Sequence, residues 1–226
     1  MNLLILGRGK TGSLVAEVAR ERRHHVQTLD GSENQSACAL TPDFLSPFSV
    51  VLDFTNPAAA LANAEACMRA SKCMVMGTTG WYGEIGRLRQ LVAESNTGFL
   101  YGSNFSIGVN LFFEAVRVAG AALNYDYSGQ IFERHHAQKK DAPSGTAMVI
   151  QKILKEVNEQ EVEIVSFREG DVVGLHEVVF NSAADRVYLC HDAKSRKGFA
   201  EGAVRGAEWL LGKTGFFDFR DVWREL

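Results

Sequence analysis

The sequence predicts an α/β protein with a Rossmann-type, doubly wound parallel sheet, followed by a second α+β domain with a mixed or antiparallel open sheet. Three observations predict this fold class. A short apolar strand at Asn2–Leu6 runs into a glycine turn and a helix. Strands and helices then alternate as far as residue 101. Beyond residue 104, three strands follow one another without a helix between them.

The first turn, Gly7-Arg-Gly-Lys-Thr-Gly12, has the spacing GxGxxG between a strand and a helix. Glycines at these places permit a tight turn, the close approach of a pyrophosphate, and close packing of the helix on the strand. The alternative is an ordinary glycine-rich turn. The residues of this turn that we expect to hold a dinucleotide are Gly7, Arg8, Gly9, Lys10, Thr11 and Gly12.

The second predicted strand, His25–Leu29, ends at Asp30. An acid about twenty residues beyond the glycines commonly hydrogen-bonds the adenosine ribose and would repel a 2′-phosphate. Asp30 therefore favours NADH slightly over NADPH, although it also suits a turn before Gly31. Because Arg8 or Lys10 could bind a 2′-phosphate, both cofactors stay open.

Three further strands are predicted at 50–54, 73–76 and 99–101, with helices at 57–70 and 82–94 and an irregular piece at 32–49. The carboxyl ends of parallel strands meet at one edge of a sheet, where ligands bind. The turn Gly77-Thr-Thr-Gly80 falls there, and its threonines would offer hydroxyls and open backbone, unless it is simply a tight turn. The residues expected to hold the cofactor at this edge are Gly77, Thr78, Thr79, Gly102, Ser103, Asn104 and Phe105.

The pattern changes near residue 104, where a helix at 109–123 precedes strands at 129–135, 162–167, 176–181 and 186–191. We predict a dinucleotide-binding domain at 1–104 and a second, substrate-binding domain at 105–198, to which the resemblance given below adds oligomerisation. The segment 199–226 is expected to rejoin the first domain, because its aromatic residues need a surface to cover.

The run from Glu133 to Ala147 contains two histidines and two lysines and ends in Pro143-Ser-Gly-Thr146, which is typical of a helix start. Free N–H groups at such a start, beside small Gly145, suit an acidic ligand. Either histidine could transfer a proton, but both can face one ligand only if the strand ends between them. The alternative is a strand, a turn and a capped helix with solvated charges. Candidate residues are His135, His136, Lys139, Ser144, Gly145 and Thr146.

Composition restricts the function further. The 226 residues carry a net charge of −3, which gives no sign of nucleic-acid binding. We find no apolar run long enough to span a membrane and no signal-peptide pattern, so we expect a cytoplasmic protein. The four cysteines and six histidines match no metal-binding spacing, and we expect no metal and reduced thiols.

The sequence resembles the dihydrodipicolinate reductases, also called 4-hydroxy-tetrahydrodipicolinate reductases, along nearly its whole length. The matching runs are Val51–Thr55, Gly77–Gly80, Asn104–Asn110, Glu133–Ala147, Gly174–Glu177, Phe199–Arg205 and Gly215–Asp221. The glycine loop is one residue shorter than is usual in the family, Thr11 replaces a common methionine, the 32–49 region is short, and Ser103 replaces a small apolar residue.

The resemblance implies that NAD(P)H reduces a cyclic, unsaturated imine dicarboxylate in the diaminopimelate route to lysine. It makes His135 the acid/base histidine and Lys139 the proton donor, with a pKa lowered by cationic neighbours. It makes His136, Gly145 and Thr146 substrate ligands, and it implies a homotetramer formed through the second-domain sheets. Two alternatives remain: another nicotinamide-dependent oxidoreductase of small oxo- or imino-acids, and a non-catalytic dinucleotide sensor.

Overall fold

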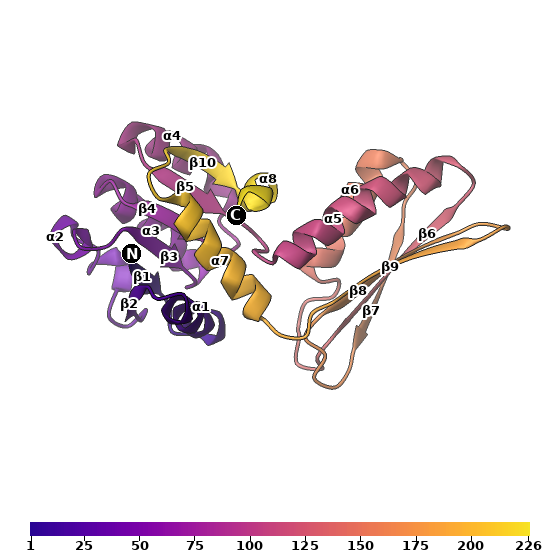
Figure 1. Ribbon diagram of the computed structural model, residues 1–226, viewed down its shortest axis with the longest axis horizontal. Coiled ribbons are helices and arrows are strands. Elements are labelled where there is room, and N and C mark those ends of the chain that lie inside the picture. Colours follow the sequence, from indigo (N-terminus) through magenta and orange to yellow (C-terminus); the bar gives the residue numbers. More distant parts are fainter. The chain divides into compact units, whose positions relative to one another are not determined.

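The computed structural model describes all residues, Met1–Leu226, as two compact units (Figure 1). The first unit comprises Met1–Ile107 and Lys197–Leu226, and the second comprises Gly108–Arg196. Each unit has its own sheet and its own hydrophobic core.

The first unit is built on a six-stranded sheet in the order β10-β5-β4-β3-β1-β2, in which neighbouring strands are parallel. Its central strands are short and buried on both faces, which explains their uninterrupted apolar sequences. The strands are β1 (Asn2–Leu6), β2 (His25–Leu29), β3 (Val50–Asp53), β4 (Cys73–Met76), β5 (Gly98–Tyr101) and β10 (Gly215–Asp218).

Helices cover both faces of this sheet. Alternate strand residues pack in one core with α1 (Lys10–Glu21) and α7 (Lys197–Leu210), and the remaining strand residues pack in a second core with α3 (Pro57–Arg69) and α4 (Ile85–Ser95). The connection predicted to be irregular contains only short pieces, η1 (Gln35–Ala37) and α2 (Pro42–Leu45), and another 3-10 turn, η2 (Tyr82–Glu84), precedes α4. This is a doubly wound parallel sheet, so the fold class predicted for this half of the chain is correct.

The C-terminal segment adds an element that the sequence did not predict. Residues Gly215–Asp218 form the edge strand β10, which is parallel to β5. The ring of Phe216 stacks on that of Phe99, with 5.1 Å between the two centroids. It also lies against the ring of Tyr101, with a centroid distance of 5.0 Å. The chain then ends in two short turns of helix, α8 (Phe219–Val222) and η4 (Trp223–Glu225).

The second unit has a mixed four-stranded sheet in the order β7-β6-β8-β9. Strand β6 (Ser128–His135) is parallel to β7 (Glu163–Arg168) and antiparallel to β8 (Leu175–Asn181), which pairs with β9 (Arg186–Asp192). Helices α5 (Ile107–Ala119) and α6 (Gly145–Val157) pack on one face of this sheet, and η3 (Gly120–Asn124) extends α5 (Figure 1). A mixed sheet agrees with the prediction.

One helix of the second unit is apolar enough to be compared with a membrane-spanning segment. The stretch Ile107–Asn124 has the length and the mean hydropathy, 1.2 over 18 residues, of a membrane-spanning helix. In the structure 39% of this stretch is buried. Val109, Phe112, Phe113 and Val116 lie in the core of the second unit, so the apolar composition reflects a core-facing helix.

Candidate active site

The cluster of charged residues begins at the end of β6. The strand ends at His135, so His136 already belongs to the following turn, as the prediction required. Glu133 and His135 alternate with partly buried neighbours and point toward the helices, where their relative exposures are 0% and 7%. A buried carboxylate is costly unless it is paired, so its partners determine what this site can do.

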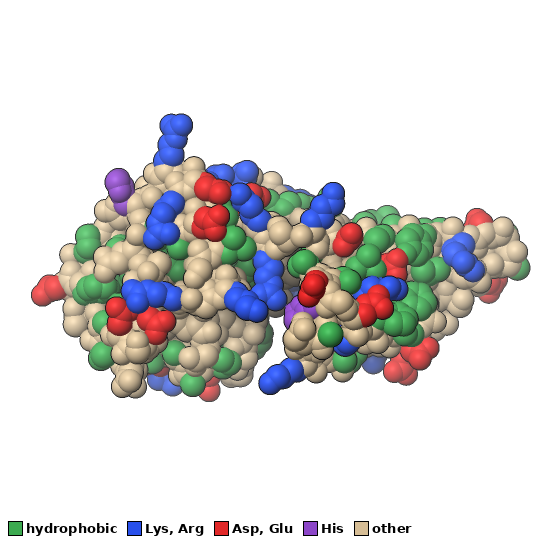
Figure 2. Space-filling model, turned by 90° about the horizontal axis from the view of Figure 1, so that it is seen from below, with side chains coloured by type: hydrophobic (Ala, Val, Ile, Leu, Met, Phe, Trp, Pro, Cys, Tyr) green, Lys and Arg blue, Asp and Glu red, His purple; other side chains and the backbone are tan.

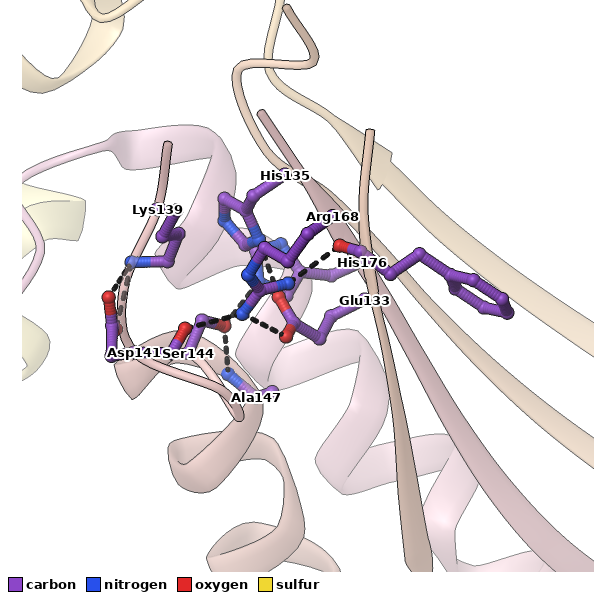
Figure 3. Close-up of polar contacts among 9 residues, drawn as sticks. Glu133, His135, Lys139, Asp141, Ser144, Ala147, Arg168 and His176 are labelled. Atoms are coloured by element: carbon purple, nitrogen blue, oxygen red, sulfur yellow. Dashed lines mark hydrogen bonds and ion pairs between the residues drawn. The ribbon is translucent and has the colours of Figure 1, made fainter. Parts of the chain in front are cut away.

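Glu133 lies between two basic side chains (Figure 3). One carboxylate oxygen, Oε2, is 2.5 Å from His135 Nδ1, and the other, Oε1, accepts a hydrogen bond of 2.7 Å from Arg168 Nη2. Burial opposes ionisation of Glu133, but the hydrogen bonds from Arg168 and Ser166 outweigh it and lower the Glu133 pKa. Burial lowers the His135 pKa, and Glu133 only partly offsets this. The pair is therefore a carboxylate facing a neutral imidazole that carries its proton on Nδ1.

His176 on β8 is a buried member of the cluster that the sequence analysis missed. It is the direct cross-strand partner of Glu133, and its ring lies edge-on to that of His135 with centroids 5.2 Å apart. Burial, followed by the nearby His135, lowers the pKa of His176 to about 3, so the ring is neutral. Gly174 makes room here, since a Cβ at that position would lie 3.1 Å from His135 Nε2. The Gly174-Leu-His-Glu177 run was noted as a resemblance, but it signalled no role for His176.

Ser144 caps α6, as predicted. Its Oγ accepts a 3.2 Å hydrogen bond from Ala147 N and lies 3.1 Å from His176 Nε2, so this buried hydroxyl is already engaged. Gly145 differs, because no atom lies within 4 Å of the place where its Cβ would be. The start of α6 is thus exposed at Gly145 and partly exposed at Thr146, with the positive end of the helix dipole behind it.

Lys139 has an anionic partner in addition to the cationic neighbours expected from the sequence. Its Nζ contacts both carboxylate oxygens of Asp141, at 2.7 and 2.8 Å (Figure 3). Arg168 Nη2 reaches the same turn and donates to the Asp141 carbonyl oxygen at 2.5 Å. Arg168 therefore connects the buried Glu133 with the turn that carries Lys139.

Glu133, His135 and His176 also meet the geometric condition for a metal site, with one ligand atom from each within 4.8 Å of the others. The spacing of histidines along the sequence gave no hint of this, because β6 and β8 bring the residues together. However, Arg168 and His135 already hold the Glu133 carboxylate, so a cation would have to displace them.

In the first unit, a cavity of about 230 Å³ lies at the carboxyl ends of the parallel strands. Four of its lining residues, Thr11, Gly77, Thr78 and Thr79, were predicted to bind the cofactor. The remaining lining residues are Phe54, Thr55, Pro57 and Phe199. Phe54 and Thr55 were expected at this edge of the sheet but not named as cofactor ligands, and Pro57 and Phe199 were not expected there. Phe54 and Thr55 directly follow β3, so their place at the end of a parallel strand was the available signal.

A buried aspartate holds the turns around this cavity. Asp53 Oδ1 accepts hydrogen bonds from Thr55 Oγ1 and Thr78 Oγ1, both 2.7 Å, and Oδ2 accepts one of 2.8 Å from Asn63 Nδ2. The hydroxyl of Thr78 is therefore bound internally, and its carbonyl accepts from Trp81 Nε1 at 2.7 Å. The expectation that Thr78 offers a hydroxyl and open backbone was wrong. Thr79, in contrast, is exposed.

The glycines of the first turn form a cradle that fits a dinucleotide. A Cβ on Gly7 would lie 2.4 Å from the Phe54 carbonyl oxygen, and Gly7 has φ +97°. A Cβ on Gly12 would lie 2.0 Å from the Gly7 carbonyl oxygen, whereas Gly9 faces open space. Larger residues would separate helix from strand, and the open backbone at Gly9 suits the approach of a pyrophosphate. Lys10 begins α1 and is exposed.

The last predicted cofactor turn, Gly102–Phe105, is only partly open. Gly102 is buried and Ser103 exposed, while Asn104 Oδ1 accepts a hydrogen bond of 2.9 Å from Ser106 N. Phe105 is 0% exposed, and its ring packs against those of Phe54, Phe199 and Phe219. Its side chain is part of the core, which corrects the expectation that it contacts the cofactor.

Arg8 and Asp30 lie away from the cavity lining, at the carboxyl end of β2. Arg8 donates to Thr28 through Nε and Nη2, and its Nη1 is 2.8 Å from Glu33 Oε2. Asp30 Oδ1 accepts from both the backbone and the hydroxyl of Ser32, which lowers the Asp30 pKa. An ionised acid thus stands where a ribose is commonly bound.

Comparison with known proteins identifies the family. The family model described as "Dihydrodipicolinate reductase, N-terminus" matches residues 1–105, and that described as "Dihydrodipicolinate reductase, C-terminus" matches residues 108–223. The chain belongs to the dihydrodipicolinate reductase family. The family resemblance and the fold class inferred from the sequence are thereby confirmed.

Individual members of the family cover most of the chain. The 4-hydroxy-tetrahydrodipicolinate reductase of Christiangramia forsetii is 39% identical, over 100% of this chain and 99% of its own. That of Chromobacterium violaceum is 37% identical, over 83% of this chain and 79% of its own. A solved structure, the dipicolinate-bound dihydrodipicolinate reductase from Paenisporosarcina sp. TG-14, has a TM-score of 0.80 at 23% identity, over 98% and 99% of the two chains, which supports the fold.

Proposed function

We propose that this family member catalyses the NAD(P)H-dependent reduction of 4-hydroxy-tetrahydrodipicolinate to tetrahydrodipicolinate, in the diaminopimelate route to lysine. The observation that carries the proposal is the match of both family models, over 1–105 and 108–223, to a chain that contains both a dinucleotide cradle and an acid–base cluster. The chain is accordingly an oxidoreductase of amino-acid biosynthesis.

The substrate is a small dicarboxylate, and its docking place is the start of α6. One carboxylate accepts hydrogen bonds from the backbone N–H groups of Gly145 and Thr146, beside the open space at the Gly145 Cβ position. Lys139 supplies positive charge once Asp141 releases it, and His136 begins the turn beside it. Ser144 supports the site by capping α6 and contacting His176, so its hydroxyl orients the helix start.

The chemistry needs one proton from the protein. NADH or NADPH supplies the hydride when it is bound. The 4-hydroxyl of the substrate leaves as water, while the hydride adds to one ring carbon and a proton adds to a neighbouring atom. Lys139 donates that proton, and the Asp141 carboxylate orients it beforehand. His135 keeps its Nδ1 proton toward Glu133, so Nε2 carries the lone pair that can accept a hydrogen bond or a proton from the substrate side.

The cofactor is held by the glycine turn Gly7–Gly12, by Gly77–Thr79, and by the backbone at Gly102–Asn104. NADH is preferred slightly over NADPH, because Asp30 is ionised and partly exposed at the end of β2.

We also propose that the protein is a cytoplasmic homotetramer, and the sheet of the second unit supports the assembly. Helices α5 and α6 cover one face of its sheet, and the strand register places apolar side chains on the other. Phe167 and Tyr188 of that face are 39% and 53% exposed, and Figure 2 shows hydrophobic side chains gathered between charged ones on this unit. Open apolar sheet faces of this kind are commonly covered by a second copy.

Coupling the preceding synthase to the purified chain, and following oxidation of NADH and NADPH in parallel, tests the function. We expect cofactor oxidation that depends on the synthase product. Oxidation only with other oxo- or imino-acids would indicate a different oxidoreductase, and binding of NADH without oxidation would indicate a sensor.

A further inference from the structure

The ion pair between Arg8 and Glu33 occupies the place where Rossmann-type proteins discriminate between their two cofactors. Arg8 leaves the glycine turn after β1, and its guanidinium lies over the end of β2. In this fold, an acid after the second strand binds the ribose hydroxyls of NAD, and an arginine nearby accommodates the 2′-phosphate of NADP. This chain has both kinds of residue in the same place.

Every nitrogen of the Arg8 guanidinium already has a partner. Nε donates to Thr28 Oγ1 at 3.1 Å, Nη2 donates to the Thr28 carbonyl oxygen at 3.0 Å, and Nη1 is 2.8 Å from Glu33 Oε2. Arginine binds phosphate best through two parallel N–H groups on one edge of its planar guanidinium group. Arg8 can present such an edge only after it leaves Thr28 or Glu33.

Glu33 is itself fixed in this position. The same Oε2 atom that faces Arg8 accepts a 2.7 Å hydrogen bond from the backbone N–H of Asp30. The region therefore has two carboxylates, those of Asp30 and Glu33, and one guanidinium, so its local charge is negative even with Arg8 present. A 2′-phosphate entering here meets net repulsion, and it must also compete with Glu33 for Arg8.

We propose that Glu33 is a specificity-determining residue, which discriminates against NADPH by holding Arg8 in an ion pair and by adding a second negative charge beside Asp30. The inference rests on the proposed dinucleotide site and deepens it. It assigns a role to a residue of the shortened 32–49 segment, which lies outside the glycine motif. It also predicts that loss of one acid makes the chain accept both cofactors.

The test compares Glu33→Gln with the unmodified chain by isothermal titration calorimetry of NADH and NADPH. Each protein is also titrated with AMP and with adenosine 2′,5′-bisphosphate, which isolate the contribution of the 2′-phosphate. Gaining one charge-assisted contact and losing one repulsive charge should lower the ratio Kd(NADPH)/Kd(NADH) about tenfold in Glu33→Gln. Glu94→Gln on α4, whose acid contacts Gln90, is the matched control and should leave this ratio within about twofold, the scale of a remote surface charge.

The double variant Arg8→Gln, Glu33→Gln separates release of Arg8 from simple loss of repulsion. If Arg8 provides the new phosphate contact, the double variant loses most of the gain in NADPH affinity. An unchanged ratio in Glu33→Gln, or a gain that persists fully without Arg8, would overturn the proposal. Both side chains are about half exposed, so the fold should tolerate the changes, and circular dichroism checks this. If the ratio shifts but no substrate is reduced, the proposed function fails and this inference stands.

Discussion

Replacing Glu133 by glutamine should change the tautomer of His135 while keeping the shape of the site. The carboxylate now accepts a hydrogen bond from Arg168 Nη2 through Oε1, and its Oε2 lies 2.5 Å from His135 Nδ1. A glutamine has one acceptor oxygen and one NH₂ group. If its oxygen stays with Arg168, its NH₂ group faces Nδ1, and the imidazole proton must move to Nε2. His135 then presents a proton where it previously presented a lone pair.

The structure sets the size of two effects. The side chain of Arg168 is 17% exposed and would lose its buried counter-charge, a change that costs about 3–5 kcal/mol when one partner of a buried pair is removed. A glutamine keeps a neutral hydrogen bond worth about 1 kcal/mol, so we expect the free energy of unfolding to fall by about 2–4 kcal/mol. Loss of the correct tautomer should lower kcat about a hundredfold, as expected for impaired acid–base catalysis.

Three measurements test this prediction together: urea unfolding, steady-state kinetics, and the imidazole ¹⁵N shifts of His135. The matched control is Glu156→Gln, which removes an exposed partner of Arg117 in the same unit, where both side chains are 47% exposed. An exposed pair contributes at most about 1 kcal/mol, and the control should keep full turnover. Near-normal turnover in Glu133→Gln, with His135 still protonated at Nδ1, would refute the reasoning.

Three further predictions concern other parts of the two sites. Lys139→Ala should lower kcat by about a hundredfold or more, as for a lost general acid. Lys152 is an exposed lysine on α6, and Lys152→Ala should leave kcat unchanged. Equal steady-state kinetics for the two variants would show that Lys139 takes no part in the chemistry. The pKa of His176 is lowered from 6.5 to about 3 in the folded chain, so the unfolded chain takes up a proton first as the pH falls. The free energy of unfolding should therefore fall by about 2 kcal/mol between pH 7 and pH 5 because of His176. Denaturant unfolding at the two pH values should show this loss in the unmodified chain and not in His176→Gln. Asp53→Ala should weaken NADH binding in a calorimetric titration and lower the free energy of unfolding by about 3 kcal/mol, because three side-chain donors, two of them buried, lose their acceptor. An unaltered Kd for NADH would show that the Asp53 network does not shape the cavity.

The sequence predicted the features that depend on neighbouring residues. Glycine spacing after a buried strand specified the first turn, because only that spacing permits the close contact between Gly7 and Gly12. Ser144 signalled the start of α6, since a cap acts within one helical turn. The turn-forming residues after His135 likewise indicated where β6 ends.

Features that depend on pairing between distant strands were not predictable in this way. Glu133 meets His176 because β6 and β8 are antiparallel in one register, and His135 is paired with Arg168 through β7. A shift of one residue in either strand would turn these side chains to the other face, and no local signal fixes that register. The partners of Glu133, which determine its charge and that of His135, were therefore missing from the sequence analysis.

Two other errors have similar causes. The edge strand β10 has four residues, too few for a clear periodicity, and it forms because β5 offers an unpaired edge. Thr78 looked available because its turn is polar, but its hydroxyl is bound by Asp53, 25 residues earlier in the chain. In each case a long-range contact decided the outcome.

The central claim is that a dicarboxylate binds the open start of α6 beside the Glu133–His135 pair. The most direct measurement is an NMR titration of the ¹⁵N-labelled chain with dipicolinate, followed at the backbone amides. We predict saturable shifts of the Gly145 and Thr146 amides, together with a change at Lys139 as Asp141 releases it. Saturable binding that leaves the Gly145 and Thr146 amides unmoved would contradict the account.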